Sequence, residues 1–482
     1  MPDHLPGLLT LVANGPPLTF NYATKTPAPK NWIAVYNAHG GGPDEEKFVS
    51  PALAWVYAPK AQDTAHVSVA GLLPGAYKAY FLALDGYKWL AEPIRVMIPG
   101  SGPIFFLSKH FTTRNARVGD KFQHKLAGLI ANVPDSKTTF AKTKGDAWLQ
   151  VTDTGILWGT PTAEGKTQVI IEATATNKSK AQLQVDIPVC AKGSQLVTQL
   201  SVLTMNMWFG GTPVRDFHRK QVQFLIDSNV DLVGLQESRG GHPTRLAEAL
   251  GWDYWQSNSA IDLGILSRYP IAESYQPTEA GGSVRVLLDG DESQVMVWNT
   301  HLGYTPYGPY NLCFDGMSVE QTIKSEEASS RNREIDEILK RMKPQIANAD
   351  HRPVILTGDF NAPSHLDWTD KTKDQHCGIG DVPWPTSVKP IAAGLLDSFR
   401  EVHGDAVAEP GNTWSPIYLY NTDYKKPEPQ DRIDFVYFKG LQVIASSVQM
   451  VGSPKPEPNH QDNEWTSDHK AVKSVFKVPG KH

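Results

Sequence analysis

The chain has 482 residues, of which 40% are hydrophobic and 20% are charged, values typical of a soluble protein with about three domains. No apolar run approaches the roughly 18 residues that a membrane-spanning helix requires, so the sequence excludes an integral membrane protein. The formal net charge of −5 argues against a generally basic, nucleic-acid-binding surface.

Residues 1–99 are predicted to form short strands separated by turns. The runs 31–36 and 77–84 are rich in aromatic and β-branched side chains, and Pro-Gly and Asp-Gly pairs flank the second run. This spacing predicts a small antiparallel β-sandwich. The stretches NWIAVY and LPGAYKAYFLALDGYKWLAEPI resemble SKICH-type or related immunoglobulin-like modules, which precede some phosphatases.

Residues 104–190 follow a Pro/Gly-rich break and are also predicted to be β-structure. The run 169–174 is β-branched, and residues 181–187 alternate with a period of two. The segments GDAWL and GILWGTP resemble the cadherin-like immunoglobulin repeat, which implies a second β-sandwich and no chemistry. Binding to a surface or partner, positioning of a substrate and added stability stay open as roles for these two modules.

The cysteines and the N-terminus leave the compartment open. Cys190, Cys313 and Cys377 can form at most one disulfide and match no zinc module. No signal peptide is visible, and Met1 suits a native start as well as a start added after leader removal. The sequon at Asn177 matters only in a secreted protein.

Residues 197–478 change to alternating strands and helices. Strands are predicted over residues 200–205, 230–235, 295–300 and 353–357, and helices over 217–228 and 318–342. Six polar clusters lie at or inside such strands, and they contain Asn206, Glu237, His301, Asp359 with Asn361, Asp431 with Asp434, and Asp468 with His469. Each cluster alone has a structural explanation, such as a cap or an Asx turn. Together they predict one active site at the strand ends.

These clusters resemble the endonuclease/exonuclease/phosphatase superfamily through the motifs NMW, LQES, ILSRYPI, NTHL, GDFNAPS, RIDFVY and SDH. The resemblance implies a four-layered α/β sandwich of the DNase I type, with two central β-sheets flanked by helices. The whole chain is therefore expected to be multidomain, with two N-terminal β-sandwich modules before this catalytic domain. The resemblance also implies a phosphoester hydrolase that uses Mg²⁺ or Mn²⁺.

Phosphoester hydrolysis requires charge neutralisation, a positioned water and protonation of the leaving oxygen. By the resemblance, Glu237 supplies an oxygen ligand to the metal, which suits Mg²⁺ or Mn²⁺. Asn206 assists at the metal or the phosphate, and Asp468 is a further ligand for metal or water.

The same resemblance assigns the catalytic groups. Asp359 orients or deprotonates the attacking water, and Asn361 donates a hydrogen bond to the phosphate. His301 and His469 hold the phosphoryl oxygens, and His469 is the acid–base histidine, kept in its tautomer by a carboxylate.

Three further residues are expected to support these groups. Family members place the acid that orients His469 on either side of the Arg-Ile pair, so Asp431 and Asp434 are both open, with Asp434 preferred. Asp262 is a candidate for orienting His301. Arg268 is a candidate support residue for which a structural role is preferred.

The substrate pocket is predicted from aromatic residues near the site. Residues 303–316 form an aromatic loop directly after His301. Tyr304, Tyr307 and Tyr310 of this loop, with Trp208, are predicted to wall a pocket for an apolar or planar group. The alternative, a loop that packs its own small core, stays open.

Three functions are weighed. The preferred one is a sphingomyelinase- or phospholipase C-like phosphodiesterase acting on a small organic or lipid-headgroup phosphoester. A DNase I-like nuclease requires basic clusters, but its candidates, Lys371, Lys373, Lys425 and Lys426, are interleaved with acids. A non-catalytic binding protein is disfavoured because no central catalytic residue is missing.

Overall fold

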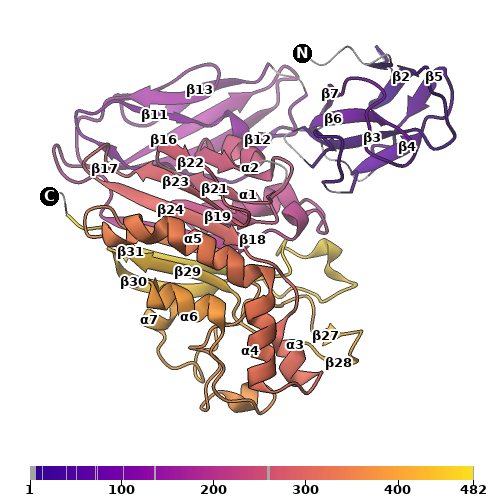
Figure 1. Cartoon of the computed structure of the whole chain (residues 1–482). Coiled ribbons are helices and arrows are strands. Elements are labelled where there is room, and N and C mark those ends of the chain that lie inside the picture. Colours follow the sequence, from indigo (N-terminus) through magenta and orange to yellow (C-terminus); the bar gives the residue numbers. More distant parts are fainter. Residues whose placement is uncertain are drawn as a thin grey trace.

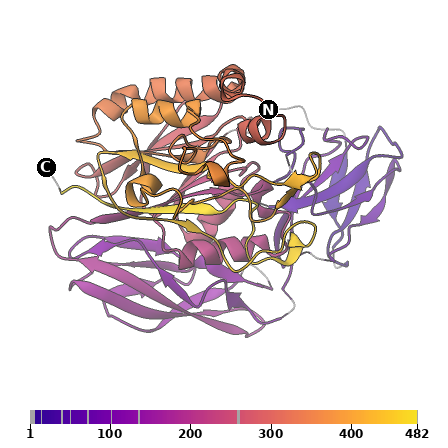
Figure 2. The ribbon, with the colours of Figure 1, turned by 90° about the horizontal axis from the view of Figure 1, so that it is seen from below.

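The computed structural model describes residues 7–13, 15–38, 41–49, 51–70, 72, 74–100, 102–134, 137–257 and 261–480. A first β-rich region, a second β-rich region and a C-terminal α/β region follow one another along the chain (Figure 1). The first β-rich region lies at one end of the α/β region, and the second lies along its side (Figure 2). This order confirms the predicted β-rich N-terminal part before an α/β part. Within the described ranges, no helix is both long and apolar enough to span a membrane.

Two small sheets share one core in the first β-rich region. Their orders are β1–β2–β5 and β4–β3–β6–β7. The strands are β1 (Leu8–Leu11), β2 (Thr19–Ala23), β3 (Trp32–Asn37), β4 (Ala54–Tyr57), β5 (Gln62–His66), β6 (Gly75–Leu82) and β7 (Ile94–Ile98). Phe20 and Tyr22 of β2 are buried whereas Asn21 between them is exposed, because successive side chains of a strand face opposite sides. The buried side chains meet Ile33 and Phe81 of the other sheet.

The second β-rich region shares its hydrophobic core with the α/β region. Its strands are β8 (Phe105–Phe106), β9 (His110–Thr112), β10 (Ala116–Arg117), β11 (Phe122–Lys125), β12 (Ile130–Ala131), β13 (Thr139–Lys144), β14 (Leu149–Val151), β15 (Ile156–Gly159), β16 (Gly165–Thr174) and β17 (Lys180–Cys190). Ile171 and Leu183 belong to the same buried cluster as Met205 and Leu246 of the α/β region. The second β-rich region is therefore packed against the α/β region by burial of apolar surface.

Two six-stranded sheets form the centre of the α/β region. The first large sheet has the order β20–β21–β19–β18–β31–β30, and the second has the order β22–β23–β24–β25–β29–β26. The first contains β18 (Gln199–Asn206), β19 (Leu232–Gln236), β20 (Asp253–Gln256), β21 (Gly264–Ser267), β30 (Gln442–Gln449) and β31 (Ala471–Lys477). The second contains β22 (Ile271–Tyr275), β23 (Gly281–Leu287), β24 (Gln294–His301), β25 (Val354–Asp359), β26 (Leu396–Asp397) and β29 (Asp434–Lys439). Val202 and Ile265 of the first meet Val297 and Ile355 of the second in one core.

Helices cover the outer faces of both large sheets. Apolar side chains of α1 (Phe217–Asp227) and α2 (His242–Leu250) share a core with the first large sheet. Those of α5 (Ser330–Ala347) share a core with the second, which α6 (Pro385–Ala392) also borders. The remaining elements are α3 (Gly308–Cys313), α4 (Val319–Ala328), α7 (Ser398–Val402) and the short hairpin β27 (Tyr420–Asn421) and β28 (Lys426–Pro427). The predicted domain ranges 1–99, 104–190 and 197–478 stay predictions.

The prediction of one continuous helix over residues 318–342 is wrong, because the structure divides it into α4 and α5. Ser329 between them has extended dihedral angles, φ −72° and ψ 159°, and both its amide and its hydroxyl donate to the carbonyl of Glu326. The side chain of Glu326 forms a buried ion pair with Arg331. These polar contacts interrupt the helix, although the apolar spacing of Ile335 and Ile338 continues through α5.

One disulfide is present among the described residues. It joins Cys313 at the end of α3 to Cys377, and Cys190 is free. The pairing agrees with the expectation of at most one bridge and one remaining thiol.

Candidate active site

The candidate site lies where strands of both large sheets end. Asn206 ends β18, His301 ends β24 and Asp359 ends β25. In the register of the second large sheet, Asp359 lies beside His301 on one side and Asp434 on the other. His469 comes just before β31, the antiparallel neighbour of β18. The two sheets therefore bring residues distant in sequence to one edge.

A buried polar network joins the two sheets next to this edge. The side-chain amide of Gln236 donates to Oδ1 of Asn299 at 2.6 Å, and the hydroxyl of Thr357 donates to the same atom at 3.1 Å. All three side chains are buried, and satisfied buried networks fix one arrangement of the elements that carry them. Sequence reasoning missed these positioning residues, although each is within two residues of a predicted site residue.

Asp359 is the centre of the site. Its Oδ2 accepts a hydrogen bond from Nδ2 of Asn206 at 3.0 Å, and its Oδ1 accepts one from the backbone amide of Asn361 at 2.9 Å. Nε2 of His301 and Nε2 of His469 lie 3.6 and 3.7 Å from Oδ2. A single carboxylate oxygen thus faces both imidazoles.

His469 is oriented by Asp434. Nδ1 of His469 lies 2.9 Å from Oδ2 of Asp434, which directs Nε2 towards Asp359. Burial opposes the positive charge of His469, but Asp434 and Asp359 outweigh burial and raise its pKa well above the ordinary value. Oδ1 of Asp434 is buried and has no hydrogen-bond partner among the residues that the structure describes.

His301 is oriented in the same way by Asp262. Nδ1 of His301 lies 3.1 Å from Oδ1 of Asp262. Burial lowers the pKa of His301, but Asp262, with a smaller effect of Asp359, outweighs burial and raises the pKa to about 10. The structure therefore brings together the predicted pair and places a cationic imidazole on each side of Asp359.

Asn206 links two acids. Its Nδ2 donates to Asp359 and, at 3.3 Å, to Oε1 of Glu237, while its Oδ1 accepts the backbone amide of Trp208. This arrangement suits hydrogen bonding between the acids better than metal ligation, which requires the amide oxygen. Oε2 of Glu237 accepts the amide of Phe209 at 2.7 Å, and Glu237 has a left-handed φ of 50°, an uncommon conformation that is frequent at functional sites.

Asp468 lies next to this group. Burial raises its pKa to about 8, with His469 opposing this effect and Glu237 adding to it. Its Oδ1 is buried without a hydrogen-bond partner within the described ranges. A buried carboxylate oxygen of this kind is costly unless a proton or a cation completes it.

Two predicted support residues lie outside the group. Asp431 faces away from His469, since its carboxylate accepts Nε1 of Trp368 and the hydroxyl of Tyr307, each at 2.8 Å. Arg268 follows the end of β21 that pairs with the start of β19, so it lies at the opposite end of the sheet, where it binds Asn229. The preferred structural role of Arg268 agrees with this position.

The sequence pattern of the Endonuclease/Exonuclease/phosphatase family matches residues 203–469. The chain belongs to this family. A protein of Caenorhabditis elegans, "Uncharacterized protein F14F9.5", is 34% identical over 283 residues, which span 57% of this chain and 90% of that protein. The match leaves the N-terminal β-rich part without a family assignment, so the SKICH-type and cadherin-like resemblances stay predictions.

Two solved structures are also similar to this chain. Truncated TDP2 of Caenorhabditis elegans is 16% identical, with 58% of this chain and 98% of that chain covered and a TM-score of 0.39. The catalytic domain of human nocturnin with bound sulfate is 15% identical, with 59% and 96% covered and a TM-score of 0.36.

Family membership and the buried acids identify the chain as a phosphoesterase whose site could hold a divalent metal. Ligand atoms of Asp359, Asp434 and His469 lie within 4.8 Å of one another. The buried, unpartnered oxygens of Asp434 and Asp468 are hard ligands of the kind that Mg²⁺ and Mn²⁺ prefer. The residues present therefore fit such an ion.

The aromatic residues predicted to wall a pocket have different surroundings. Tyr304 is exposed, whereas the hydroxyls of Tyr307 and Tyr310 donate to the buried acids Asp431 and Glu428. Trp208 is buried, with its ring 6.1 Å from that of Tyr418. Tyr307 and Tyr310 are thus bound to residues of a distant loop, and contact of these aromatic residues with a substrate stays a prediction.

An aromatic wall stands beside His469 instead. The ring of Trp414 lies 5.0 Å from the His469 ring, and Tyr418 stacks on Trp414 at 5.6 Å. Both aromatic side chains are half-buried, so each keeps part of its surface exposed. The sequence does not indicate that Tyr418 lies near the candidate site. Its loop is positioned by a β-bridge between Trp414 and His469, which are distant in sequence.

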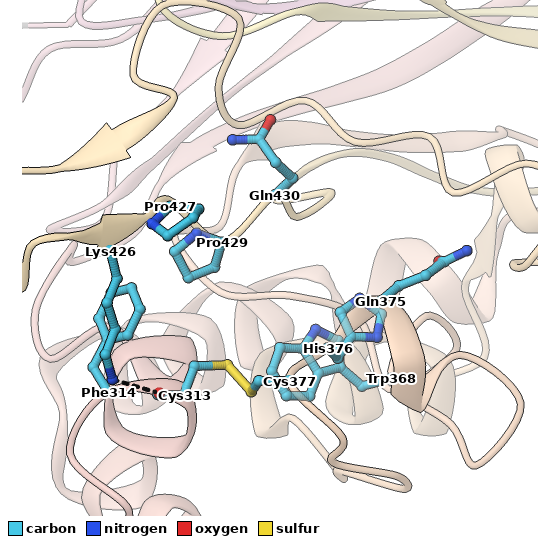
Figure 3. A pocket seen from close by; sticks show the side chains of 10 residues that line it. All are labelled: Cys313, Phe314, Trp368, Gln375, His376, Cys377, Lys426, Pro427, Pro429 and Gln430. Carbon is cyan, nitrogen blue, oxygen red and sulfur yellow. Dashed lines mark hydrogen bonds between the residues drawn. A yellow bond between two sulfur atoms is a disulfide. The ribbon is translucent and has the colours of Figure 1, made fainter.

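A separate cavity of about 250 Å³ lies beside the disulfide (Figure 3). Its walls include the disulfide, Phe314, Lys426 and Trp368, and Trp368 donates to Asp431. None of the residues that hold His301 or His469 lines this cavity. It therefore borders the candidate site without opening into the catalytic group.

Proposed function

We propose that the chain is a divalent-metal-dependent phosphodiesterase that acts on a small organic or lipid-headgroup phosphoester. The observation that carries this proposal is the half-buried aromatic wall of Trp414 and Tyr418 beside His469. An apolar or planar part of a substrate can pack on this wall while the phosphoryl group faces the imidazoles.

Asp359 is the proposed base. Hydrogen bonds from Asn206 and from the amide of Asn361 hold its carboxylate in one orientation, so it can orient an attacking water and accept its proton. One amide proton of Asn361 is donated to the carbonyl of Leu302, and the other is available to a phosphoryl oxygen.

The two histidines are proposed to act as cations. His469 keeps its proton because of Asp434, and the 3.7 Å between its Nε2 and Asp359 exceeds a hydrogen bond. Its Nε2 proton is therefore available to the leaving oxygen, which His469 protonates as the ester bond breaks. His301, charged through Asp262, would stabilise negative charge on a phosphoryl oxygen.

Glu237 and Asp468 are the proposed ligands of Mg²⁺ or Mn²⁺, and the unpartnered oxygen of Asp434 would offer a further ligand atom. The bound ion would neutralise charge on the phosphoryl oxygens. Asn206, which donates to Glu237 and Asp359, would fix the positions of these two carboxylates relative to each other.

The test compares bis-p-nitrophenyl phosphate with p-nitrophenyl phosphate, each with Mg²⁺, Mn²⁺ or EDTA. We expect metal-dependent cleavage of the diester, and a loss of about 10²–10⁴-fold in His469→Gln. His365→Gln is the matched control, because this histidine binds Ser387 outside the candidate site. EDTA-resistant turnover would contradict the metal, and cleavage of the monoester alone would indicate a phosphatase.

Natural substrates are compared next. Sphingomyelin and phosphatidylcholine should be cleaved faster than plasmid DNA at equal phosphate concentration. A preference for plasmid DNA would replace this proposal with a nuclease.

A further inference from the structure

Two pairs of aromatic rings lie at the surface of the first β-rich region and are joined through a buried tryptophan. Phe48, Trp55 and Tyr57 expose 53%, 52% and 45% of their surface. Trp55 and Tyr57 have ring centroids 5.0 Å apart, and Phe48 and Tyr87 have centroids 5.6 Å apart. Trp32, which is buried beneath them, joins the two pairs, at 6.1 Å from Trp55 and 6.0 Å from Tyr87. Exposed apolar side chains gathered in this way mark an interaction surface, and we call these five residues, with Trp32 as their buried support, the aromatic strip.

Leu84 extends the aromatic strip at its Tyr57 end. It lies in the turn after β6 and is 66% exposed. The next residue, Asp85, accepts the hydroxyl of Tyr57 at 3.0 Å and the ammonium of Lys30 at 2.7 Å, so the turn is tied to the strip. An exposed aliphatic side chain next to tryptophan and tyrosine is suited to the boundary region of a bilayer, where lipid headgroups meet acyl chains.

The charges around the aromatic strip suit zwitterionic headgroups. Lys47 and Lys88 are exposed and adjoin two of its rings in sequence, and neither has an ion-pair partner within the described ranges. Two nearby acids are engaged, Asp85 by Lys30 and Glu46 by the amide of Trp89. Lysines in this position can reach lipid phosphates while the rings lie at headgroup level.

The other end of the aromatic strip adjoins the candidate active site. A Cβ atom at Gly240 would overlap the amide nitrogen of Gly41 and the side chain of Val49, so the loop that ends in Phe48 and Val49 touches Gly240. Gly240 is only three residues after Glu237. The loop that carries Phe48 is thus in contact with the segment that follows Glu237, at the end of the α/β region that meets the first β-rich region (Figure 1).

We propose that the aromatic strip and Leu84 form a docking face for a zwitterionic phospholipid bilayer. Phe48 and Leu84 have no hydrogen-bonding group in their side chains, which favours lipid over a carbohydrate. The choice of lipid also rests on the proposed function, whereas docking itself requires no hydrolysis.

The experiment measures binding of the full chain to phosphatidylcholine vesicles by sedimentation in EDTA, which suppresses metal-dependent turnover. We expect the double variant Phe48→Ala/Trp55→Ala to bind at least tenfold more weakly, because two rings leave the interface. Trp158→Ala is the matched control, since Trp158 is 50% exposed on β15 of the second β-rich region, and it should bind like the wild type. Circular dichroism confirms that each variant is folded, and Leu84→Asp provides a second test in the turn.

Each outcome decides the proposal. Absence of wild-type binding, equal binding by Phe48→Ala/Trp55→Ala, or equal weakening by Trp158→Ala overturns it, and retention on an insoluble polysaccharide in place of vesicles would identify a carbohydrate surface. Cleavage of bis-p-nitrophenyl phosphate should be unchanged in all variants. Vesicle binding without that activity would contradict only the proposed function, and activity without binding would contradict only the docking face.

Discussion

Replacing Asp434 by asparagine tests the catalytic assignment of His469. The substitution keeps the shape of the side chain and removes its charge, while Oδ2 of Asp434 lies 2.9 Å from Nδ1 of His469. The position is fully buried, so bulk solvent does not compensate for the lost charge. The amide oxygen of the new side chain could still hold the ring, but it would no longer stabilise the imidazolium.

The expected loss follows from the role of His469 as a proton donor. A positioned acid–base group contributes about 10²–10⁴-fold, or about 3–5 kcal/mol of activation free energy, and most of this should disappear from kcat. The matched control is Asp431→Asn, the same change three residues earlier, where the carboxylate contacts Tyr307 and Trp368. It should change kcat by less than about threefold.

The assay is the initial rate of bis-p-nitrophenyl phosphate cleavage from pH 5 to 9 with saturating Mg²⁺. Loss of the Asp434 carboxylate should lower the pKa of His469, so the rate should begin to fall at a lower pH than in the wild type. Circular dichroism checks folding, and His469→Gln provides the test if Asp434→Asn does not fold. Full activity in Asp434→Asn together with a hundredfold loss in Asp431→Asn would refute the assignment.

Three other outcomes are expected. EDTA should abolish activity, Mg²⁺ or Mn²⁺ should restore it, and Asp468→Asn should raise the metal concentration needed for half-maximal rate; unchanged metal dependence would contradict its role as a ligand. The double variant Cys313→Ser/Cys377→Ser should unfold in urea with a free energy lower by roughly 4 kcal/mol, because the bridge closes a loop across 64 positions; equal stability would contradict the pairing. Burial raises the pKa of Asp431 to about 6, so ionisation of this carboxyl group favours the unfolded chain. The stability contributed by the protonated carboxyl group is fully present below about pH 4 and is lost as the pH rises through about 6. Relative to wild type, Asp431→Asn should therefore gain up to about 3 kcal/mol between pH 4 and pH 7 in urea titrations, and a pH-independent difference would contradict the shift.

Much of the candidate site was predictable because its residues end buried strands. Asn206, His301 and Asp359 each close a strand, and a hydrophobic run followed by polar residues is a local signal. The choice between Asp431 and Asp434 was not local. It depends on register: Asp434 pairs with Asp359 across β25 and β29, whereas Asp431 forms a bridge with Trp414 outside the strand.

Contacts between distant loops could not be predicted. Tyr307 and Tyr310 look like pocket residues in the sequence, but Glu428 and Asp431, more than a hundred residues later, draw their hydroxyls inward. The proximity of Gly240 to Val49 likewise depends on how the first β-rich region meets the α/β region. Composition and periodicity describe each segment and contain no information on such pairs.

Charge balance at the candidate site supports metal dependence independently of family membership. The group contains five carboxylates and two imidazoles: Glu237, Asp262, Asp359, Asp434 and Asp468, with His301 and His469. Acidic side chains therefore outnumber the imidazoles, and repulsion between a carboxylate and an anionic phosphoester is stronger in a buried site than in water. A divalent cation would offset this excess, and the buried, unpartnered oxygens of Asp434 and Asp468 are available as its ligands. The same acids that raise the pKa values of the two histidines thus favour a bound cation at this site.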